Sequence, residues 1–426
     1  MLPMIDHANN SWVLLSSALI MFMTVPALGL FYGGLVKKKN ILSLMMQSFV
    51  CLIVVSLLWV TVGYSLAFSP TELVPGILGD FRWAFLGGIG SNDPSPYTVS
   101  DPNGPVAHLT FVIFQCMFAV ITPAVISGAF AERIKFSAFL AFSVLWLFVV
   151  YIPVAHMVWS SHGLFAQAGL MDFAGGTVVE INSGFSALAG ALMLGRRNNL
   201  RAIPPHNLTY TLTGAAMLWF GWFGFNAGSG LAADGLASSA FVMTNTAAAA
   251  AGLAWAALDW LLQRKPTILG AASGAVAGLV VITPAAGFVA LPGALVLGLL
   301  AGALCYIFVV FVKNAVGYDD SLDAFGVHGV AGVVGTLGVG LFAAPFVTAP
   351  FGMNGGAGFA GLFYGNPAAL LLQAKGVVVT VVWAFGGSLA LFAFLKVTMG
   401  IRVSEKDEAI GLDITQHNEK AYTLIE

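Results

Sequence analysis

Charged residues are scarce in this 426-residue sequence, where 17 Lys and Arg and 19 Asp and Glu make up 8% of the chain. Soluble proteins carry about 25%. Hydrophobic residues make up 58%, and the mean hydropathy is +0.90. Disorder requires the opposite balance, and a formal net charge of −2 offers no basic face to nucleic acid. The composition therefore predicts a polytopic membrane protein.

Cysteine is also scarce. The three cysteines, Cys51, Cys116 and Cys305, all lie in apolar runs. An odd number inside predicted spans argues against a disulfide framework. No two of them have the spacing of metal ligands, which excludes a thiolate metal site. We expect neither a metal nor a cofactor.

The few basic residues mark where the chain turns, because Lys and Arg collect at the cytoplasmic ends of membrane helices. One apolar run precedes the first basic cluster. Each of the five intervals between clusters can hold two spans of about 20 residues, which predicts eleven spans in all. The clusters are Lys37 to Lys39, Arg133 with Lys135, Arg196 with Arg197 and Arg201, Arg264 with Lys265, Lys313, and Lys396 with Arg402.

The sequence thus predicts an all-α membrane protein with its N-terminus outside and its C-terminus in the cytoplasm. We expect a transmembrane domain at 1–400 and a cytoplasmic tail at 401–426. The predicted spans are 11–35, 41–68, 107–131, 137–159, 174–195, 209–228, 238–262, 267–284, 291–312, 324–346 and 373–399.

Two segments of the chain resemble each other. Residues 172–190 and 323–340 each begin with an Asp, continue into a Gly-rich helix and carry one ionisable residue. Inverted repeats are common in transporters. We therefore expect a five-plus-five inverted repeat, with halves at about 11–195 and 209–346 and an extra helix at 373–399.

Two ionisable residues, Glu180 and His328, remain deep in the predicted spans. Such residues are costly in a bilayer and mark functional sites. A carboxyl and an imidazole in one apolar lumen can exchange a proton. The alternative for His328 alone is a buried histidine with a satisfied hydrogen bond. Two ligands are too few for zinc, and no G-x-S-x-G motif surrounds Ser183 or Ser186 to support a hydrolase.

Aromatic residues form a second group near the exterior ends of the spans. An aromatic face attracts cations, and a serine hydroxyl can accept a hydrogen bond from one. The alternative is an aromatic belt at the membrane interface. Together these residues suit a vestibule for a small cation that gives up its proton. They are Phe114, Phe118, Trp159, Trp222, Phe223, Phe225 and Ser229.

Several long stretches, in the same order along nearly the whole chain, resemble the ammonium transporters of the Amt/Mep/Rh family. The tail at 401–422 resembles the cytoplasmic tail of that family. The stretches are FYGGLVKKKN (31–40), AERIKFSAFL (131–140), YIPVAHMVW (151–159), DFAGGTVVEINSGFSALAG (172–190), PHNL (205–208), WFGFNAGS (222–229) and DAFGVHG (323–329).

The resemblance implies a homotrimer in the plasma membrane with one pore in each subunit. By position, Phe118, Trp159, Phe225 and Ser229 would form the outer ammonium site and its phenylalanine gate, with Phe114 beside them. Asp172 would match an aspartate that stabilises this recruitment region. The tail would match the segment that meets PII-type signal proteins in prokaryotes.

One position departs from the common pattern of the family. His328 matches the second of two paired pore histidines, but Glu180 stands where the first would be, as in some fungal members. The hypothesis is that this pair relays a proton while ammonia crosses the pore, with methylammonium as an analogue substrate. The alternatives are an ammonium sensor with little transport and an electroneutral ammonia channel. We expect no enzymatic activity.

Overall fold

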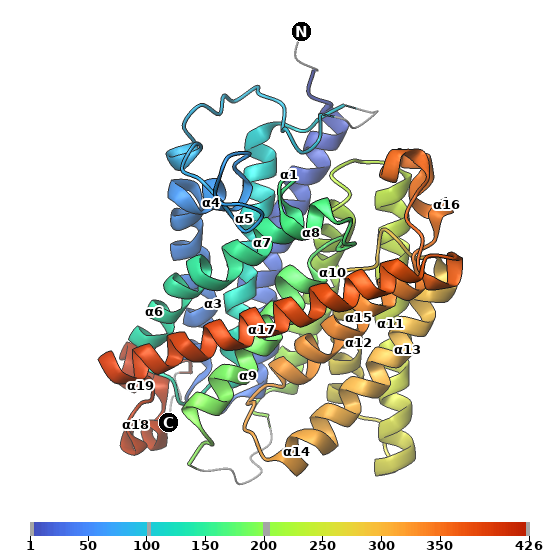
Figure 1. Cartoon of the computed structure of the whole chain (residues 1–426). Coiled ribbons are helices and arrows are strands. Elements are labelled where there is room, and N and C mark those ends of the chain that lie inside the picture. The colour runs from blue at the N-terminus through green and yellow to red at the C-terminus, as the bar shows by residue number, and fades with distance from the viewer. Residues whose placement is uncertain (1–3, 100–103, 199–204, 423–426) are drawn as a thin grey trace.

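The computed structural model describes residues 4–99, 104–198 and 205–422. Within these ranges, nine helical segments are long and apolar enough to cross a membrane. Figure 1 shows the helices packed into one bundle, with the start of α1 (His7–Phe22) at the top and α19 (Leu412–His417) at the lower left. Arg201 of the third basic cluster and residues 423–426 of the predicted tail lie outside the described residues.

Several long segments change from α-helical to wider π-helical turns along their length. In the first part of the chain the elements are α1 with η1 (Met23–Ala27) and α2 (Leu28–Leu35), α3 (Ile41–Leu58) with η2 (Trp59–Gly63) and α4 (Tyr64–Phe68), α5 (His108–Ile126) with η4 (Ser127–Phe130), α6 (Phe136–Trp146) with η5 (Leu147–Tyr151) and α7 (Ile152–Trp159), α8 (Leu164–Gln167), and η6 (Gly176–Ile181) with α9 (Asn182–Leu194). The segments η1, η2, η5 and η6 are π-helical, whereas η4 is a tighter 3-10 helix. Such π-helical turns are frequent at functional sites.

The later part of the chain repeats this pattern of long helices. Its elements are α10 (Leu208–Gly228), α11 (Gly235–Gln263), α12 (Ile268–Ile282), α13 (Leu291–Ile307) with η7 (Phe308–Val312) and α14 (Lys313–Val316), η8 (Phe325–Gly329) with α15 (Val330–Phe342), α16 (Pro345–Thr348) and α17 (Pro367–Thr398). In Figure 1, α17 crosses obliquely over the bundle, and it packs against α9 and α15. The tail contributes α18 (Glu405–Ile410) and α19.

Every one of the eleven predicted spans overlaps one of these helical segments. The all-helical membrane fold is therefore confirmed. The nine segments above exclude α10 and the 15-residue α12, so the count of eleven spans stays a prediction. The orientation of the chain across the membrane and the domain boundaries also stay predictions.

Two of the regions between spans are longer and contain short elements of their own. The region between the predicted spans 41–68 and 107–131 contains a small antiparallel hairpin of β1 (Glu72–Val74) and β2 (Leu78–Gly79), followed by the turn η3 (Ala84–Leu86). The segment between α15 and α17 contains α16 and the turns η9 (Ala349–Phe351), η10 (Met353–Gly356) and η11 (Leu362–Tyr364).

Two central helices, η6–α9 and η8–α15, run in opposite directions and pack closely. A Cβ atom added at Gly184 would lie only 2.2 Å from the backbone N of Gly329. A Cβ atom added at Gly332 would lie 2.9 Å from both Glu180 Cβ and Ile181 N. Small residues allow membrane helices to approach to backbone contact. These two glycines therefore set the spacing of the two helices.

An aspartate caps the beginning of each central helix. The Asp172 carboxylate accepts from the N–H groups of Gly175, Gly176 and Thr177 at 2.6 to 2.8 Å. Asp320 accepts from the N–H groups of Ala324 and Phe325 at 3.0 and 2.8 Å. Carboxylates at a helix N-terminus satisfy N–H groups that lack partners within the helix.

The resemblance of segments 172–190 and 323–340 predicts that Asp323 is the counterpart of Asp172. The structure shows that this prediction is wrong. The capping counterpart of Asp172 is Asp320, which precedes His328 by as many residues as Asp172 precedes Glu180. Asp323 instead forms an ion pair with Lys313, in a backbone conformation with φ of 60°.

Candidate functional site

Glu180 and His328 meet in the middle of the bundle. Glu180 lies in η6 and His328 in η8, and His328 Nδ1 is 2.7 Å from Glu180 Oε2. The two side chains are only 1% and 7% exposed. A hydrogen bond at this distance requires a proton between the two atoms, on either the ring or the carboxyl group. The pair can therefore hold a proton and pass it from one side chain to the other.

Close packing of the two central helices explains why the pair forms. Gly332 lies one turn after His328 and faces Glu180, while Gly184 lies one turn after Glu180 and faces Gly329. Each pore residue is thus followed by a glycine that admits the opposite helix. A side chain at either glycine would push the helices apart and lengthen the Glu180–His328 hydrogen bond.

A cavity of about 190 Å³ contains most of the predicted aromatic site. We call it the outer cavity, because it lies at the end of the bundle that is predicted to face the exterior. Phe114, Phe118, Trp159, Asp172 and Ser229 all line it. The ring centroids of Phe118 and Trp159 are 5.4 Å apart at 79°. The structure therefore brings these five predicted residues together, with aromatic faces and a hydroxyl around one space.

Ser229 presents an acceptor to this cavity. Its hydroxyl donates a hydrogen bond to the backbone oxygen of Phe225 at 2.8 Å. A hydroxyl has one proton to donate and two lone pairs to accept with. Because the proton is already used, the oxygen is left to accept a hydrogen bond from a cation with N–H groups.

Asp172 acts on the cavity through the backbone. Its carboxylate oxygens are committed to the N–H groups of the following turn, and its backbone oxygen accepts from Trp159 Nε1 at 3.1 Å. Asp172 therefore fixes both the start of the Glu180 helix and the position of the Trp159 indole. The role of Asp172 in supporting the recruitment region stays a prediction.

Phe225 lies below the outer cavity, and its ring centroid is 4.6 Å from that of Phe118. Phe118 lines the outer cavity, whereas Phe225 lines a much smaller space of about 10 Å³ that also contains Glu180 and His328. The two rings, tilted by 55° to one another, therefore separate the outer cavity from the central pair.

His328 borders a third and larger space on the inner side. This inner vestibule, of about 660 Å³, shares His328, Phe31 and Val276 with the small central space. The three spaces follow one another from the outer aromatic cavity, past Phe118 and Phe225, to the central pair and then to the vestibule. Together they mark a path through the bundle that is constricted at the aromatic rings and at the pair.

Sequence reasoning missed several residues along this path. Phe31 and Val276 line both the central space and the inner vestibule, and Gln115 and Tyr97 line the outer cavity. Phe31 lies within the stretch FYGGLVKKKN, and Gln115 adjoins Phe114. Phe31 and Val276 are apolar like the residues of the hydrophobic core, so only their position in the folded structure identifies them.

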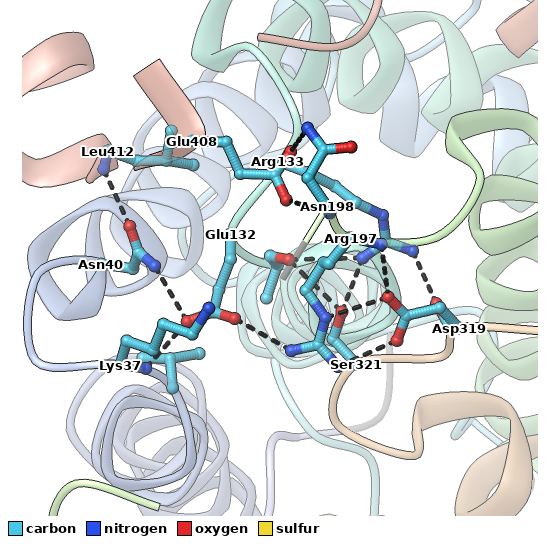
Figure 2. A network of polar contacts seen from close by, with 12 residues as sticks. Lys37, Asn40, Glu132, Arg133, Arg197, Asn198, Asp319, Ser321, Glu408 and Leu412 are labelled. Atoms are coloured by element: carbon cyan, nitrogen blue, oxygen red, sulfur yellow. Dashed lines mark hydrogen bonds and ion pairs between the residues drawn. The ribbon is translucent and has the colours of Figure 1, made fainter. Parts of the chain in front are cut away.

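A polar network closes the inner end of the bundle, and Figure 2 shows its side chains converging from several loops. The Arg133 side chain is completely buried and donates to five acceptors, among them the backbone oxygens of Gly195 and Asp319. Burial lowers the pKa of Arg133 to about 10. Arg133 thus ties the end of α9 to the loop before the His328 helix.

Arg197 joins the same loops through ion pairs. Its guanidinium is 2.9 Å from Glu132 Oε2 and from Asp319 Oδ1. Burial alone would raise the pKa of Asp319, but Arg197 and Arg133 lower it below the ordinary value. The ends of the Glu180 and His328 helices are therefore held together by charge at the inner face.

The tail packs onto this inner network (Figure 2). Asn40 bridges Glu132 and the backbone N of Leu412 at 2.8 Å each, and Glu408 accepts from the backbone N of Asn198 at 2.7 Å. The tail therefore contacts the turns that follow α2 and α9.

Comparison with known proteins decides the family. The model of the ammonium transporter family matches residues 11–422. The chain belongs to the ammonium transporter family. An ammonium transporter of Bacillus subtilis is 48% identical over 405 residues, covering 95% of this chain and 96% of that protein.

Two solved structures have the same fold as this family member. The crystal structure of Saccharomyces cerevisiae Mep2 superposes with a TM-score of 0.86 at 34% identity, covering 95% of this chain and 89% of that one. A structure named Sensor Amt Protein superposes with a TM-score of 0.85 at 29% identity, covering 96% of this chain and 98% of that one.

Membership of the ammonium transporter family confirms several predictions. The chain is a multi-pass protein of the plasma membrane, it is a transporter rather than an enzyme, and ammonium is the substrate that its family implies. The roles of Glu180, His328 and the outer aromatic residues stay predictions.

Proposed function

We propose that this transporter recruits ammonium in the outer cavity, that the ammonium gives up its proton to the relay of Glu180 and His328, and that neutral ammonia crosses the pore. The observation that supports this mechanism is the 2.7 Å hydrogen bond of a buried carboxyl and imidazole between the outer and inner spaces. Transport of a whole cation through an apolar constriction would require desolvation of its charge, which is costly. Separating ammonia from its proton avoids that cost.

The outer cavity suits the first step of the mechanism. Trp159 and Phe118 present ring faces, which attract a small cation by about 0.5–2 kcal/mol. Ser229 adds a hydrogen-bond acceptor. Past Phe118 and Phe225 the central space accepts a small neutral molecule better than an ion, because its lining is apolar apart from Glu180 and His328.

The experiment is ammonium-evoked current from proteoliposomes on a solid-supported membrane. Glu180→Gln keeps the shape of the side chain but cannot ionise, and His328→Ala removes the ring. Both variants are expected to lose most of the current or to change the selectivity for ammonium over potassium. Undiminished current with unchanged selectivity in both variants would overturn the relay.

Gly386→Ala supplies the matched control for reconstitution. A Cβ atom at Gly386 in α17 would meet nothing within 4 Å, so this variant should carry wild-type current. The same recordings separate the alternative functions. A sensor, as the name of one structural neighbour suggests, would give little flux of ammonium or methylammonium, and an electroneutral channel would give flux without current.

We also infer from the family resemblance that three copies of the chain assemble, each with its own pore. Native mass spectrometry of the detergent-solubilised protein tests this inference, and a monomer would contradict it. The docked tail further leads us to propose that a PII-type signal protein binds at the inner face. Deletion of residues 401–426 should abolish that binding.

A further inference from the structure

A second buried carboxylate–imidazole pair lies on the exterior side of the bundle, apart from the central pair. His156 in the last turn of α7 is completely buried, and its Nε2 is 2.9 Å from Glu72 Oε1 in β1. The Glu72 side chain is 19% exposed. No role in the conduction path explains this pair, because neither residue lines the three spaces along it.

Both ring nitrogens of His156 face oxygen acceptors. Nδ1 is 2.8 Å from the backbone oxygen of Ala67, and Nε2 faces the Glu72 carboxylate. A backbone oxygen can only accept a hydrogen bond, as can an ionised carboxylate. A neutral imidazole has one N–H and could satisfy only one of these contacts. Two N–H groups, and hence an imidazolium, satisfy both.

The surroundings of the ring also favour a positive charge. Ala67 lies near the C-terminal end of α4, and His156 itself is in the last turn of α7. Helix C-termini carry partial negative charge and stabilise cations. Burial raises the pKa of Glu72, but hydrogen bonds from His156 and Gly76 and the nearby His156 and His162 lower it below the ordinary value. Glu72 therefore serves as an acceptor, as the Ala67 oxygen does, and the two contacts of the ring call for two N–H groups.

The Glu72 carboxylate organises the exterior hairpin around the same contact. Its Oε1 also accepts from the backbone N of Gly76 at 2.7 Å. The backbone oxygen of Gly76 in turn accepts from Leu164 N at 2.9 Å. The hairpin is thereby attached to both α7 and α8, on either side of the turn that follows Trp159.

His156 and Trp159 are three residues apart on α7, so both belong to its last turn. Trp159 lines the outer cavity, where its ring lies 5.4 Å from that of Phe118. We propose that His156 is an imidazolium held by Glu72, and that this ion pair positions Trp159 in the outer ammonium site. The proposal rests on the proposed function only for its effect on substrate binding.

The protonation state of His156 can be read without transport. The chain has seven histidines, and the difference between ¹⁵N spectra of histidine-labelled wild type and His156→Gln assigns the ring. At neutral pH both nitrogens should show the shifts of protonated imidazolium. A neutral-tautomer pattern would overturn the proposal, whether or not the protein transports ammonium.

The effect on Trp159 is measured by the kinetics of methylammonium uptake. Glu72→Gln removes the carboxylate charge at a partly exposed position. It should raise the KM about tenfold while the maximal rate changes less than about twofold. This pattern indicates a loss of substrate binding without a loss of turnover. The double variant Glu72→Gln/His156→Gln should have a KM no higher than that of the single variant with the higher KM, since the two residues act as one unit.

Asp93→Asn is the matched control, because Asp93 belongs to the same exterior segment and forms no ion pair with the described residues. It should leave the KM unchanged. An unchanged KM in Glu72→Gln would overturn the positioning role. So would changes in KM and maximal rate that are the same in Glu72→Gln and in Asp93→Asn. Absence of wild-type uptake would count against the proposed function instead, and the spectra would still decide the charge of His156.

Discussion

The two central helices are built alike but carry different chemistry. In each, an aspartate caps the first turn, a π-helical turn carries one ionisable side chain, and a glycine one turn later admits the other helix. One helix contributes Glu180, the other His328. The scaffold is therefore symmetric around the pair, whereas the pair itself can hold a proton in two chemically different places.

The caps show where the symmetry ends. Asp172 faces the outer cavity and accepts three backbone hydrogen bonds of 2.6 to 2.8 Å. Asp320 accepts two such bonds near the inner face, with Asp323 and Lys313 close by. Burial and the nearby Asp323 raise the pKa of Asp320 to about 6. The outer cap is therefore the firmer support of the two.

The largest effect is expected from breaking the contact between the helices. Gly184→Ala places a methyl group 2.2 Å from the backbone of Gly329, where nothing flexible can yield. Overpacking lowers the unfolding free energy by about 1–3 kcal/mol and occasionally more. We expect Gly184→Ala to lose an amount at the upper end of this range and to lose its ammonium-evoked current. Gly332→Ala meets atoms at 2.9 Å and should lose less stability.

Thermal unfolding in detergent measures both variants, with Gly386→Ala as the control. That control should be as stable as wild type or slightly more stable, because Ala is the better helix former. Equal stability of Gly184→Ala and wild type would mean that the two helices are free to separate.

The next largest effect compares the two caps. Asp172→Asn should lower the unfolding free energy by about 2–3 kcal/mol, since charged hydrogen bonds contribute about 1.5–3 kcal/mol each and the amide retains part of them. Asp320→Asn should cost about 1 kcal/mol, because its carboxylate accepts fewer bonds. Chemical unfolding monitored by tryptophan fluorescence ranks the two variants, and the reverse order would refute the difference between the caps.

Exchanging the two central residues sharpens the comparison further. Glu180→His combined with His328→Glu preserves one carboxyl and one imidazole, and so should retain current within about tenfold, or about 1.4 kcal/mol, of wild type. Glu180→Leu leaves His328 without its partner and should reduce current more. If the exchanged protein is as inactive as Glu180→Leu, the order of the residues matters and the two helices are not interchangeable.

The smallest effect concerns pH. Because the pKa of Asp320 is raised from its ordinary value of 3.8 to about 6 in the folded protein, folding favours its protonated form, and its contribution to stability falls as pH rises from 3.8 to about 6. Asp320→Asn lacks this titration. The stability of wild type relative to Asp320→Asn should therefore decline over that range. A difference that is constant over the same range would contradict the raised pKa.

Much of the fold could be predicted from the sequence because charge is so scarce. Each basic cluster ends an apolar stretch, and every stretch proved to be helical. Glu180 and His328 were found by elimination, since few other ionisable residues lie deep in the spans. The outer site needed the family resemblance, because Trp159 or Phe118 alone cannot be distinguished from an interfacial aromatic residue.

Other features depend on how distant segments pack and have no local signal. The sequence pairs Asp172 with Asp323, but only the folded structure shows that Asp320 makes the cap. The close approach at Gly184 depends on the register of two antiparallel helices. In the sequence, nothing distinguishes His156 from any other histidine in an apolar span. Its partner Glu72 is far away in the sequence, and only the folded structure shows the contact.

The central claim is that ammonia and its proton cross separately, with the proton on Glu180 and His328. The most direct test measures charge and ammonia together, by current and by the total ammonia accumulated inside the vesicles of the same proteoliposome preparation. Wild type should move one charge per ammonia, and Glu180→Gln should move markedly less charge for each ammonia that still crosses. An unchanged ratio of charge to ammonia in Glu180→Gln would contradict the account.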